Sequence, residues 1–265
     1  MASNSFGPEL RDWRQRRRLS QLHLAAEAGV SQRHLSFLET GRSRPSREMV
    51  LHLATVLDVP LRERNTLLTS AGFAPVYSET ALDEPAMGQV RHVLEFLLEA
   101  HEPFPAIVVD RRWDVVMSNE AAVRLTVALV DPEGFPVGAG VNMMRLALHP
   151  DGVRRFTVNW PEVATTVMDR LRREAAERPH DDVLRAMVTE AESYPDVADL
   201  PRKISATGDD LLVPIHYKTE AFEARVFGTI ATLGAAYDVT VEELRMETFF
   251  PADAESEAVL RSLAG

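Results

Sequence analysis

The sequence predicts two domains: an all-α domain of five helices, followed by an α+β domain with an antiparallel sheet. In the N-terminal part, apolar residues recur at helical spacing between serine, glycine and proline residues that mark helix ends. Further along, short apolar runs lie between turn signals, as in β-hairpins. The length of 265 residues suits two domains, which we place at 1–75 and 87–265, with a linker at 76–86.

Residues 20–45 predict two short helices joined by a tight turn. Gly29 supplies the turn, where a residue without Cβ adopts a positive φ without strain. Ser31 follows at a position suited to an N-cap, and Leu35 and Leu38 fall on the buried side of the second helix. A helix, a glycine turn and a capped helix form the geometry that places a recognition helix in a DNA major groove.

Three further helices complete the first domain. The first runs over about residues 9–18, with Leu10 and Trp13 on one face. Ser46 caps the next, which stops before a proline. The last covers residues 61–71 and ends at a glycine.

The first domain resembles the phage-repressor-like (Xre-type) helix-turn-helix family over about residues 6–73. The residues that carry the resemblance are Ser20, Gln21, Leu24, Ala25, Gly29, Val30, Ser31, Leu35, Ser36, Leu38, Glu39, Gly41 and Arg42. The resemblance implies binding to a double-stranded DNA operator. The alternative is a helical domain that contacts only protein, since helical hairpins are common.

The distribution of charge agrees with DNA binding by the first domain. Residues 1–75 contain 11 arginines, no lysine and 7 acidic residues, a net charge of +4. The rest of the chain carries −15, which gives −11 in total. Basic residues are therefore concentrated in the part that must meet phosphates, and the acidic part should repel DNA.

We assign two kinds of DNA contact from this motif. Arginine suits guanine and glutamine suits adenine, so the start of the recognition helix is expected to reach base edges. The predicted base contacts are Gln32, Arg33, Ser36 and Phe37. The predicted phosphate contacts are Gln21, Arg42 and Arg44. Because one such domain buries little surface on DNA, we expect a homodimer.

The second domain begins with a helix over residues 87–99, whose apolar positions we place on one side. A first hairpin follows, with strands at 106–109 and 113–117, and then a helix at 120–129. The later elements are helices at about 160–177 and 181–192, strands at 211–218 and 222–233, and a last short segment at 247–251. Two hairpins flanking helices resemble a PAS-like sensor.

The second half is similar to the ligand-binding domain of MmyB-like transcription regulators over about residues 85–260. The segments that carry this resemblance are 105–113, 142–150 and 243–253. The resemblance implies a pocket between sheet and helices and a long-chain acyl ligand. We therefore expect a small-molecule partner with an apolar tail, such as a fatty acid.

Arg145 is the main candidate for the head group of such a ligand. It lies in an otherwise apolar run, and its planar guanidinium suits a carboxylate. The alternative is an internal salt bridge, for example to Glu247. The other candidate ligand contacts are Asn119, Asn142, His149, Val116, Met117, Met143, Phe227 and Phe249. Asparagines at helix starts commonly serve as caps, and lone histidines and methionines are commonly structural.

The sequence predicts neither an enzyme nor a cofactor or metal site. The motifs HExxH, GxSxG, the P-loop and a fitting GxGxxG are missing, and the lack of cysteine excludes disulfides and thiolate zinc sites. No apolar run reaches the roughly 18–20 residues that span a bilayer. We expect a cytoplasmic protein with no membrane partner.

The sequence is compatible with two functions. The first is a DNA-binding regulator controlled by a small apolar molecule. The second is a DNA-tethered interaction module whose second domain binds itself or another protein without a ligand. The long predicted strand at 222–233 favours the second, because an exposed strand edge can pair with another chain.

Overall fold

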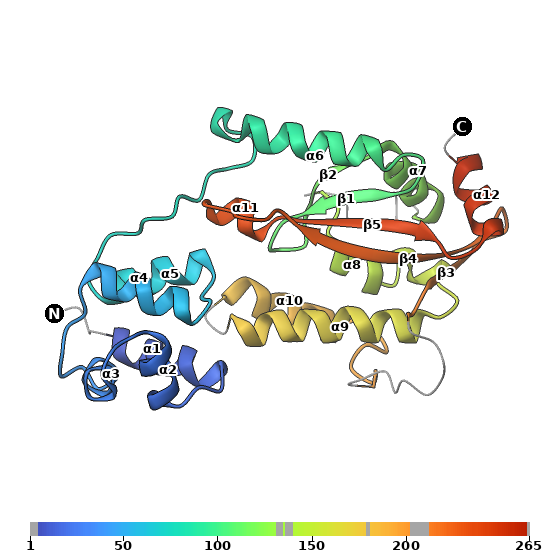
Figure 1. The fold of residues 1–265 in the computed structure, drawn as a ribbon. Helices are drawn as coiled ribbons and strands as arrows, with labels where there is room; N and C mark the ends of the chain where they lie inside the picture. The colour runs from blue at the N-terminus through green and yellow to red at the C-terminus, as the bar shows by residue number, and fades with distance from the viewer. Residues whose placement is uncertain (1–4, 131–134, 136–139, 179–180, 202–211, 264–265) are drawn as a thin grey trace. The chain divides into compact units, whose positions relative to one another are not determined.

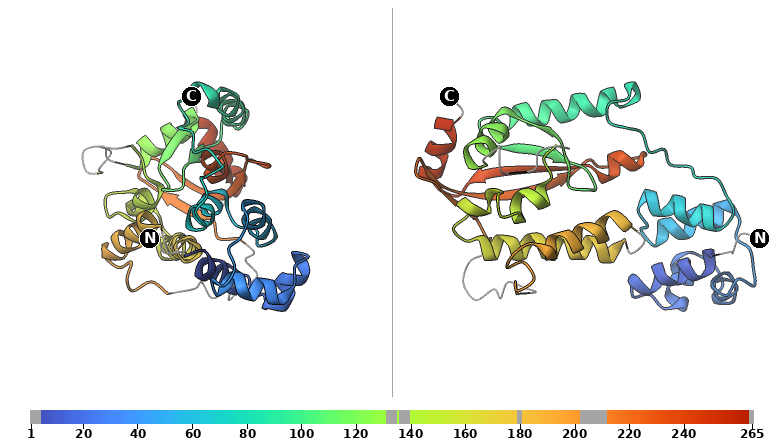
Figure 2. Two further views of the ribbon diagram at one scale, coloured as in Figure 1. Left: turned by 90° about the vertical axis from the view of Figure 1, so that its left-hand side faces the viewer. Right: turned by 180° about the vertical axis from the view of Figure 1, so that it is seen from behind.

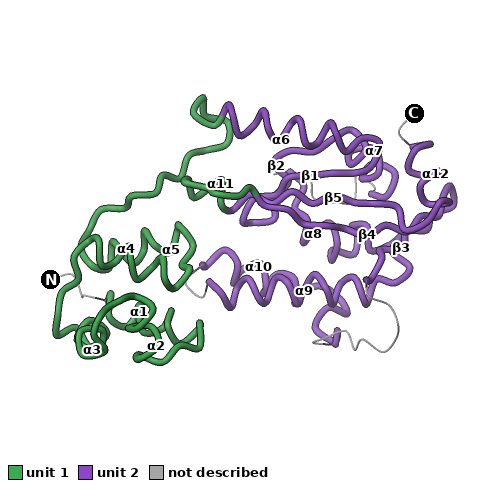
Figure 3. The backbone as a smooth tube through the Cα atoms, viewed as in Figure 1, with its two compact units in different colours: residues 1–87, 233–242 green, residues 88–232, 243–265 purple. Residues whose placement is uncertain are grey.

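The computed structural model describes residues 5–130, 135, 140–178, 181–201 and 212–263 (Figure 1). The chain divides into two compact units (Figure 3). The first consists of Met1–Met87 and Leu233–Glu242, and the second of Gly88–Thr232 and Glu243–Gly265. The first unit is thus built from two stretches of chain that are far apart in the sequence.

The first unit contains the five predicted helices. They are α1 Phe6–Arg16, α2 Gln21–Glu27, α3 Gln32–Glu39, α4 Arg47–Val56 and α5 Leu61–Ser70. The hydroxyls of Ser20, Ser31 and Ser46 accept hydrogen bonds from backbone amides three residues further on, which caps α2, α3 and α4. Gly29 lies in the turn between α2 and α3 with a φ of 63°. Leucines from all five helices form one buried core.

The second unit is built around a five-stranded antiparallel sheet. Its strands are β1 Ala106–Val109, β2 Val115–Ser118, β3 Ile215–Lys218, β4 Glu223–Thr232 and β5 Arg245–Pro251, in the order β2-β1-β5-β4-β3. The predicted fold class, five helices followed by an α+β domain, is confirmed. The strand predicted at 113–117 starts only at Val115, because Trp113 has a φ of 65° and belongs to the turn. Of the strand predicted at 211–218, Leu211 lies outside the described residues.

Helices lie against both faces of this sheet (Figures 1 and 2). They are α6 Gly88–Ala100, α7 Glu120–Leu129, α8 Met143–Leu148, α9 Trp160–Glu177 and α12 Ala254–Leu263, and α10 Asp182–Ser193 packs on α9 and α8. The short helices η1 Pro85–Met87, η2 Val153–Phe156 and α11 Val239–Glu243 complete the described elements. In all views α9 and α10 run side by side, and their core includes Trp113 and Met144.

Helix α6 does not bury all the apolar residues that the sequence places on one side. Leu94 and Leu98 are buried, but Val93, Phe96 and Leu97 are 39%, 65% and 37% exposed. The apolar arc is wider than the strip that contacts β1, so part of it faces solvent in this structure. None of the helices in the described parts of the chain combines the length and apolar character needed to span a bilayer.

Candidate DNA interface and ligand pocket

Helix α3, the predicted recognition helix, is held at its C-terminal end by a buried ion pair. Arg14 donates to both carboxylate oxygens of Glu39, at 2.6 and 3.0 Å, and also to the carbonyl of Leu19. Glu39 accepts a third hydrogen bond from Gln21, at 2.8 Å. Helix α1 also approaches closely here, since a Cβ on Gly7 would lie 2.6 Å from the Glu39 carbonyl oxygen. These contacts fix α3 relative to α1 and α2.

The exposed side of α3 carries the predicted base contacts. Gln32 and Arg33 are exposed in its first turn, and Ser36 and Phe37 are half-buried one turn later. The guanidinium groups of Arg33 and Arg42 lie 5.3 and 6.0 Å from the centre of the Phe37 ring. The aromatic ring thus positions two cations at one surface, a cation–π arrangement.

The predicted phosphate contacts differ in their surroundings. Arg42 and Arg44 are exposed after α3. Gln21 is half-buried at the start of α2, and its amide already donates to Glu39. The structure therefore brings Arg33, Phe37 and Arg42 together. The contacts of all seven residues with DNA stay predictions.

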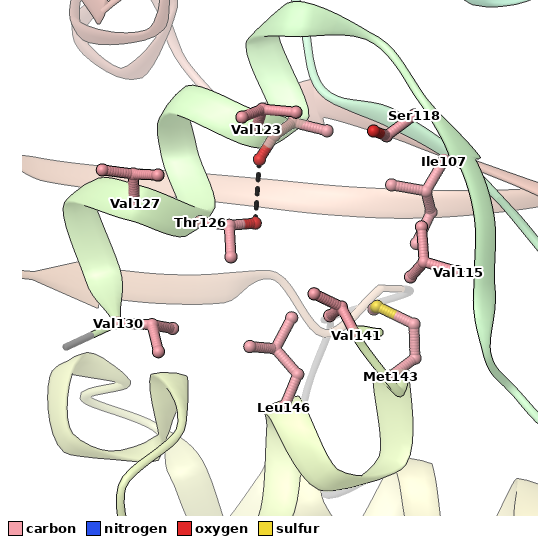
Figure 4. A pocket seen from close by; sticks show the side chains of 11 residues that line it. Ile107, Val115, Ser118, Val123, Thr126, Val127, Val130, Val141, Met143 and Leu146 are labelled. Carbon is pink, nitrogen blue, oxygen red and sulfur yellow. Dashed lines mark hydrogen bonds between the residues drawn. The ribbon is translucent and has the colours of Figure 1, made fainter. Parts of the chain in front are cut away.

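The second unit contains an apolar pocket of about 260 Å³ between β1, β2, α7 and the start of α8 (Figure 4). Its lining consists of Ile107, Val115, Ser118, Ala122, Val123, Thr126, Val127, Val130, Val141, Met143 and Leu146. The Thr126 hydroxyl donates to the carbonyl of Ala122 at 2.8 Å, the hydrogen bond drawn in Figure 4. Among the described lining residues, only Ser118 and Thr126 have polar side chains. The pocket is therefore suited to an apolar group.

An irregularity in the β1–β2 pairing shapes the pocket wall. Ile107 lies opposite Ser118 and Val109 opposite Val115, so Val116 has no partner in β1. In a regular strand, residues three apart face opposite sides of the sheet. The unpaired Val116 shifts the alternation of side chains along β2 by one residue. Val115 and Ser118 therefore both face the pocket.

Arg145 lies close in sequence to pocket residues but does not line the pocket. It forms a two-pronged salt bridge with Glu190 of α10, at 2.6 and 2.9 Å, and its side chain is 40% exposed. The hydrogen bond from Arg145 lowers the pKa of Glu190. Burial and a hydrogen bond to Glu190 raise the pKa of Tyr194 to about 12. Arg145 thus has an acidic partner, although it is Glu190 and not Glu247.

The three other polar candidates have structural partners. Asn119 caps α7 and bridges to the backbone of Ala106 and Phe104. Asn142 caps α8 and donates to the carbonyl of Arg112. His149 lies edge-on between the rings of Phe135 and Tyr194. Neither asparagine nor the histidine lines the pocket.

Of the five apolar candidates, Met143 lines the pocket. Met117 pairs with Val108 and therefore faces the side of the sheet opposite to Ile107. Phe227 stacks on Phe250, with ring centres 5.8 Å apart. Phe249 packs against the cluster of Ile107, Val109 and Ala122, next to the pocket, whereas Val116 is the unpaired residue of β2. The roles of all nine predicted ligand residues stay predictions.

A network of charges ties α9 to β5. Glu174 accepts hydrogen bonds from Arg245 at 2.9 Å, from Arg170 at 3.1 Å and from the Trp113 indole at 3.0 Å. Arg170 also donates to Glu247 at 2.6 Å. Burial alone would raise the pKa of Glu174, but the charge of Arg245, the indole hydrogen bond and the charge of Arg170 leave it below its ordinary value.

Sequence reasoning missed most of the pocket, above all the face of α7. Ala122, Val123, Thr126 and Val127 follow helical spacing along one side of this helix, and Val130 comes directly after its end. Ala121, Leu125 and Leu129 form a second, buried stripe. The sequence did contain a signal for this part of the pocket, namely two apolar stripes on one short helix. One stripe is enough to pack a surface helix on the core, so the second stripe was available for another contact.

Two family models match this chain. The model of the MmyB-like transcription regulator ligand binding domain matches residues 90–263, and that of a helix-turn-helix domain matches residues 5–67. No curated protein matches. A helix-turn-helix domain joined to such a ligand-binding domain defines a DNA-binding transcription regulator, a class that is usually not enzymatic.

The ligand-binding model covers well over half of the chain, so the protein belongs to the family of MmyB-like transcription regulators. Both resemblances inferred from the sequence, to a helix-turn-helix domain and to the MmyB-like ligand-binding domain, are thereby confirmed. The narrower Xre-type and PAS-like assignments stay predictions.

Proposed function

We propose that this regulator binds a two-fold symmetric operator as a homodimer and is controlled by a small apolar-tailed molecule, of the fatty-acid type, in the second unit. The observation that supports the ligand is the pocket of about 260 Å³ with its aliphatic lining. A dry apolar cavity of about 150 Å³ is enough to hold benzene, so this pocket has room for a segment of an acyl tail. Operator binding takes place in the cytoplasm.

On the DNA side, we propose direct readout by Gln32 and Arg33, with Ser36 and Phe37 adding contacts one turn on. The exposure of Gln32 and Arg33 supports this assignment. Arg42, Arg44 and Gln21 are proposed to bind phosphates. Gln21 would then share its amide with Glu39, which holds it in place.

Extraction of the purified protein followed by mass spectrometry tests the ligand proposal. We expect a molecule with an apolar tail to co-purify in an amount comparable to the protein. Its removal, and the addition of dodecanoic acid as a probe, should change the affinity for DNA selected from a random pool. If nothing co-purifies and the probe changes neither stability nor DNA affinity, the proposal is wrong.

The same probe tests whether Arg145 binds a carboxylate head group. Its charge is already compensated by Glu190, so we expect Arg145→Met to bind dodecanoic acid as tightly as the wild type. A loss of affinity of tenfold or more, about 1.4 kcal/mol, with retained circular dichroism would instead establish Arg145 as the anchor.

The second candidate function is a DNA-tethered interaction module without a ligand. The observation in its favour is the apolar surface of α6, where Val93, Phe96 and Leu97 are exposed in one stripe. Contiguous exposed apolar residues commonly mark protein contacts. This function predicts self-association in light scattering together with an empty extract.

A further inference from the structure

The connection between β4 and β5 folds with the helix-turn-helix unit. Residues 233–242 leave the sheet of the second unit, belong to the first unit, and return as β5 (Figure 3). Ser78 and Asp238 form a parallel β-bridge, and the amide of Val239 donates to the carbonyl of Ser78 at 2.8 Å. Thus the connection is hydrogen-bonded to the chain that follows α5.

Two carboxylates of this connection fix it within the first unit. Asp238 accepts from the Thr80 hydroxyl at 2.7 Å and from the Thr80 amide at 3.3 Å. Glu242 accepts from the backbone amide of Leu61, the first residue of α5, at 2.7 Å. Both bonds join positions more than 150 residues apart in the sequence.

Glu242 supplies what α5 lacks locally. The residue before α5 is Pro60, whose side chain has no atom able to accept a hydrogen bond and which therefore makes no cap. The first amides of a helix need acceptors, and a negative charge near them is favourable. The carboxylate of Glu242 satisfies one of these amides from a distant part of the chain.

The strand that follows Glu242 reaches the wall of the ligand pocket. Residues Arg245 and Glu247 of β5 pair with Val109 and Ile107 of β1, and Ile107 lines the pocket. Glu243, one residue after Glu242, lies 3.9 Å from Arg111 in the turn after β1. Neighbouring carboxylates are therefore anchored in different units, and a shift of β1 would be transmitted along only a few residues of backbone.

From these contacts we propose that residues 233–242 couple the ligand pocket to the helix-turn-helix unit, with Asp238 and Glu242 as the positioning residues. The proposal rests on the proposed function, because it assumes a ligand that alters operator affinity. Occupation of the pocket displaces β1 and β5, and the hydrogen bonds of Glu242 and Asp238 carry this displacement to α5 and to the chain after it. Coupling between two sites is measured as the ratio of affinities with and without the effector.

The test compares operator affinity with and without dodecanoic acid in Glu242→Ala, Thr80→Val and the wild type. Thr80→Val removes the hydroxyl that Asp238 accepts from, with little change of volume. Glu220→Ala removes an exposed carboxylate in the turn before β4 and serves as the control. We expect Glu242→Ala to bind dodecanoic acid and operator each within about threefold of wild type, and its coupling ratio to fall to within about twofold of one. Thr80→Val should fall in between, and Glu220→Ala should match the wild type.

The outcomes distinguish a failure of the coupling proposal from a failure of the proposed function. A wild-type protein that couples, together with variants that couple equally well, overturns the role of residues 233–242 and leaves the proposed function intact. A wild-type protein whose operator affinity does not respond to dodecanoic acid overturns the proposed function and the coupling with it. If Glu242→Ala is too unstable to measure, Thr80→Val decides: an unchanged ratio counts against the proposal.

Discussion

Glu39 is a buried carboxylate on the helix expected to meet DNA, and its environment shows how single residues set the geometry of the reading surface. Three hydrogen bonds from Arg14 and Gln21 give both of its oxygens a partner. A buried charge that loses its partner pays a desolvation cost without compensation. Relative to an apolar pair of similar size, the ion pair therefore adds little net stability. Its main role is to hold α3 in place.

We predict that Arg14→Met destabilises the first unit by about 3 kcal/mol, because it leaves the Glu39 carboxylate buried without its main partner. Denaturant unfolding followed by helix signal measures this change. Arg11→Met, the same substitution at an exposed arginine of the same helix, is the control and should cost less than about 0.5 kcal/mol. Equal effects of the two substitutions would contradict a structural role for the buried pair.

The two arginines that flank Phe37 are predicted to act differently on DNA. Arg33→Ala should cost about 1–3 kcal/mol on the preferred site and relax the preference for sequence, because it removes a base contact. Arg42→Ala should weaken binding to all sequences alike and reduce the salt slope by about 0.9, since it removes one phosphate contact. Titrations on selected and random DNA at several salt concentrations separate these effects. Identical losses on both DNAs for both variants would show that the assignment is wrong.

At the scale of elements, α7 forms part of the sheet's cover and also one wall of the pocket. Its buried stripe packs into the domain, whereas Val123 and Val127, at 46% and 71% exposed, line the opening of the pocket. Helix α7 therefore contacts both the pocket and the core of the domain. A molecule that fills the pocket would act directly on the position of α7.

We predict that Ala122→Leu abolishes binding of dodecanoic acid, because the larger side chain occupies the pocket that Ala122 lines. Ala128→Leu places the same side chain on the exposed side of the same helix and should leave binding unchanged. Isothermal titration of both variants gives the comparison. If Ala122→Leu binds as well as Ala128→Leu, the ligand site lies elsewhere.

Elements with a local signal were predictable from the sequence, and those defined by distant contacts were not. The helices α2 and α3 were predictable from their serine caps and from the glycine turns beside them, because these signals act within a few residues. Strand β5 lies at the centre of the sheet because it pairs with both β1 and β4. Its pairing with β1 joins residues more than a hundred positions apart, and no local sequence pattern indicates such a contact. Arg145 illustrates the same limit, because its partner Glu190 lies on another helix.

At the scale of the whole molecule, acidic residues bonded to arginines make the stability of the second unit depend on pH. The pKa of Glu190 is lowered by the hydrogen bond from Arg145, and that of Glu174 is lowered against the effect of burial by Arg245, Trp113 and Arg170. A carboxyl whose pKa is lower in the folded state stabilises the fold above its ordinary pKa, near 4.5 for glutamate. That stability is lost as the pH falls towards the lowered value.

We therefore predict that the free energy of unfolding of the second unit decreases as the pH is lowered from about 6 to about 4, through protonation of carboxylates in the unfolded chain. Glu174→Gln should reduce both the stability near neutral pH and this dependence. Glu162→Gln, at an exposed glutamate of the same helix, is the control. Thermal unfolding across this range measures both quantities, and parallel pH profiles for the wild type and Glu174→Gln would contradict the prediction.

The two-part composition of the first unit limits how this regulator can be recombined with others. A hybrid that joins residues 1–87 to a foreign sensor leaves behind residues 233–242, and with them the acceptor for the first amide of α5. A helix-turn-helix fragment that ends at the linker would therefore lack the carboxylate that caps the N-terminus of α5. A functional exchange of domains between such proteins requires that residues 1–87 and 233–242 are transferred together. We therefore expect the DNA-binding and ligand-binding domains to be inherited together.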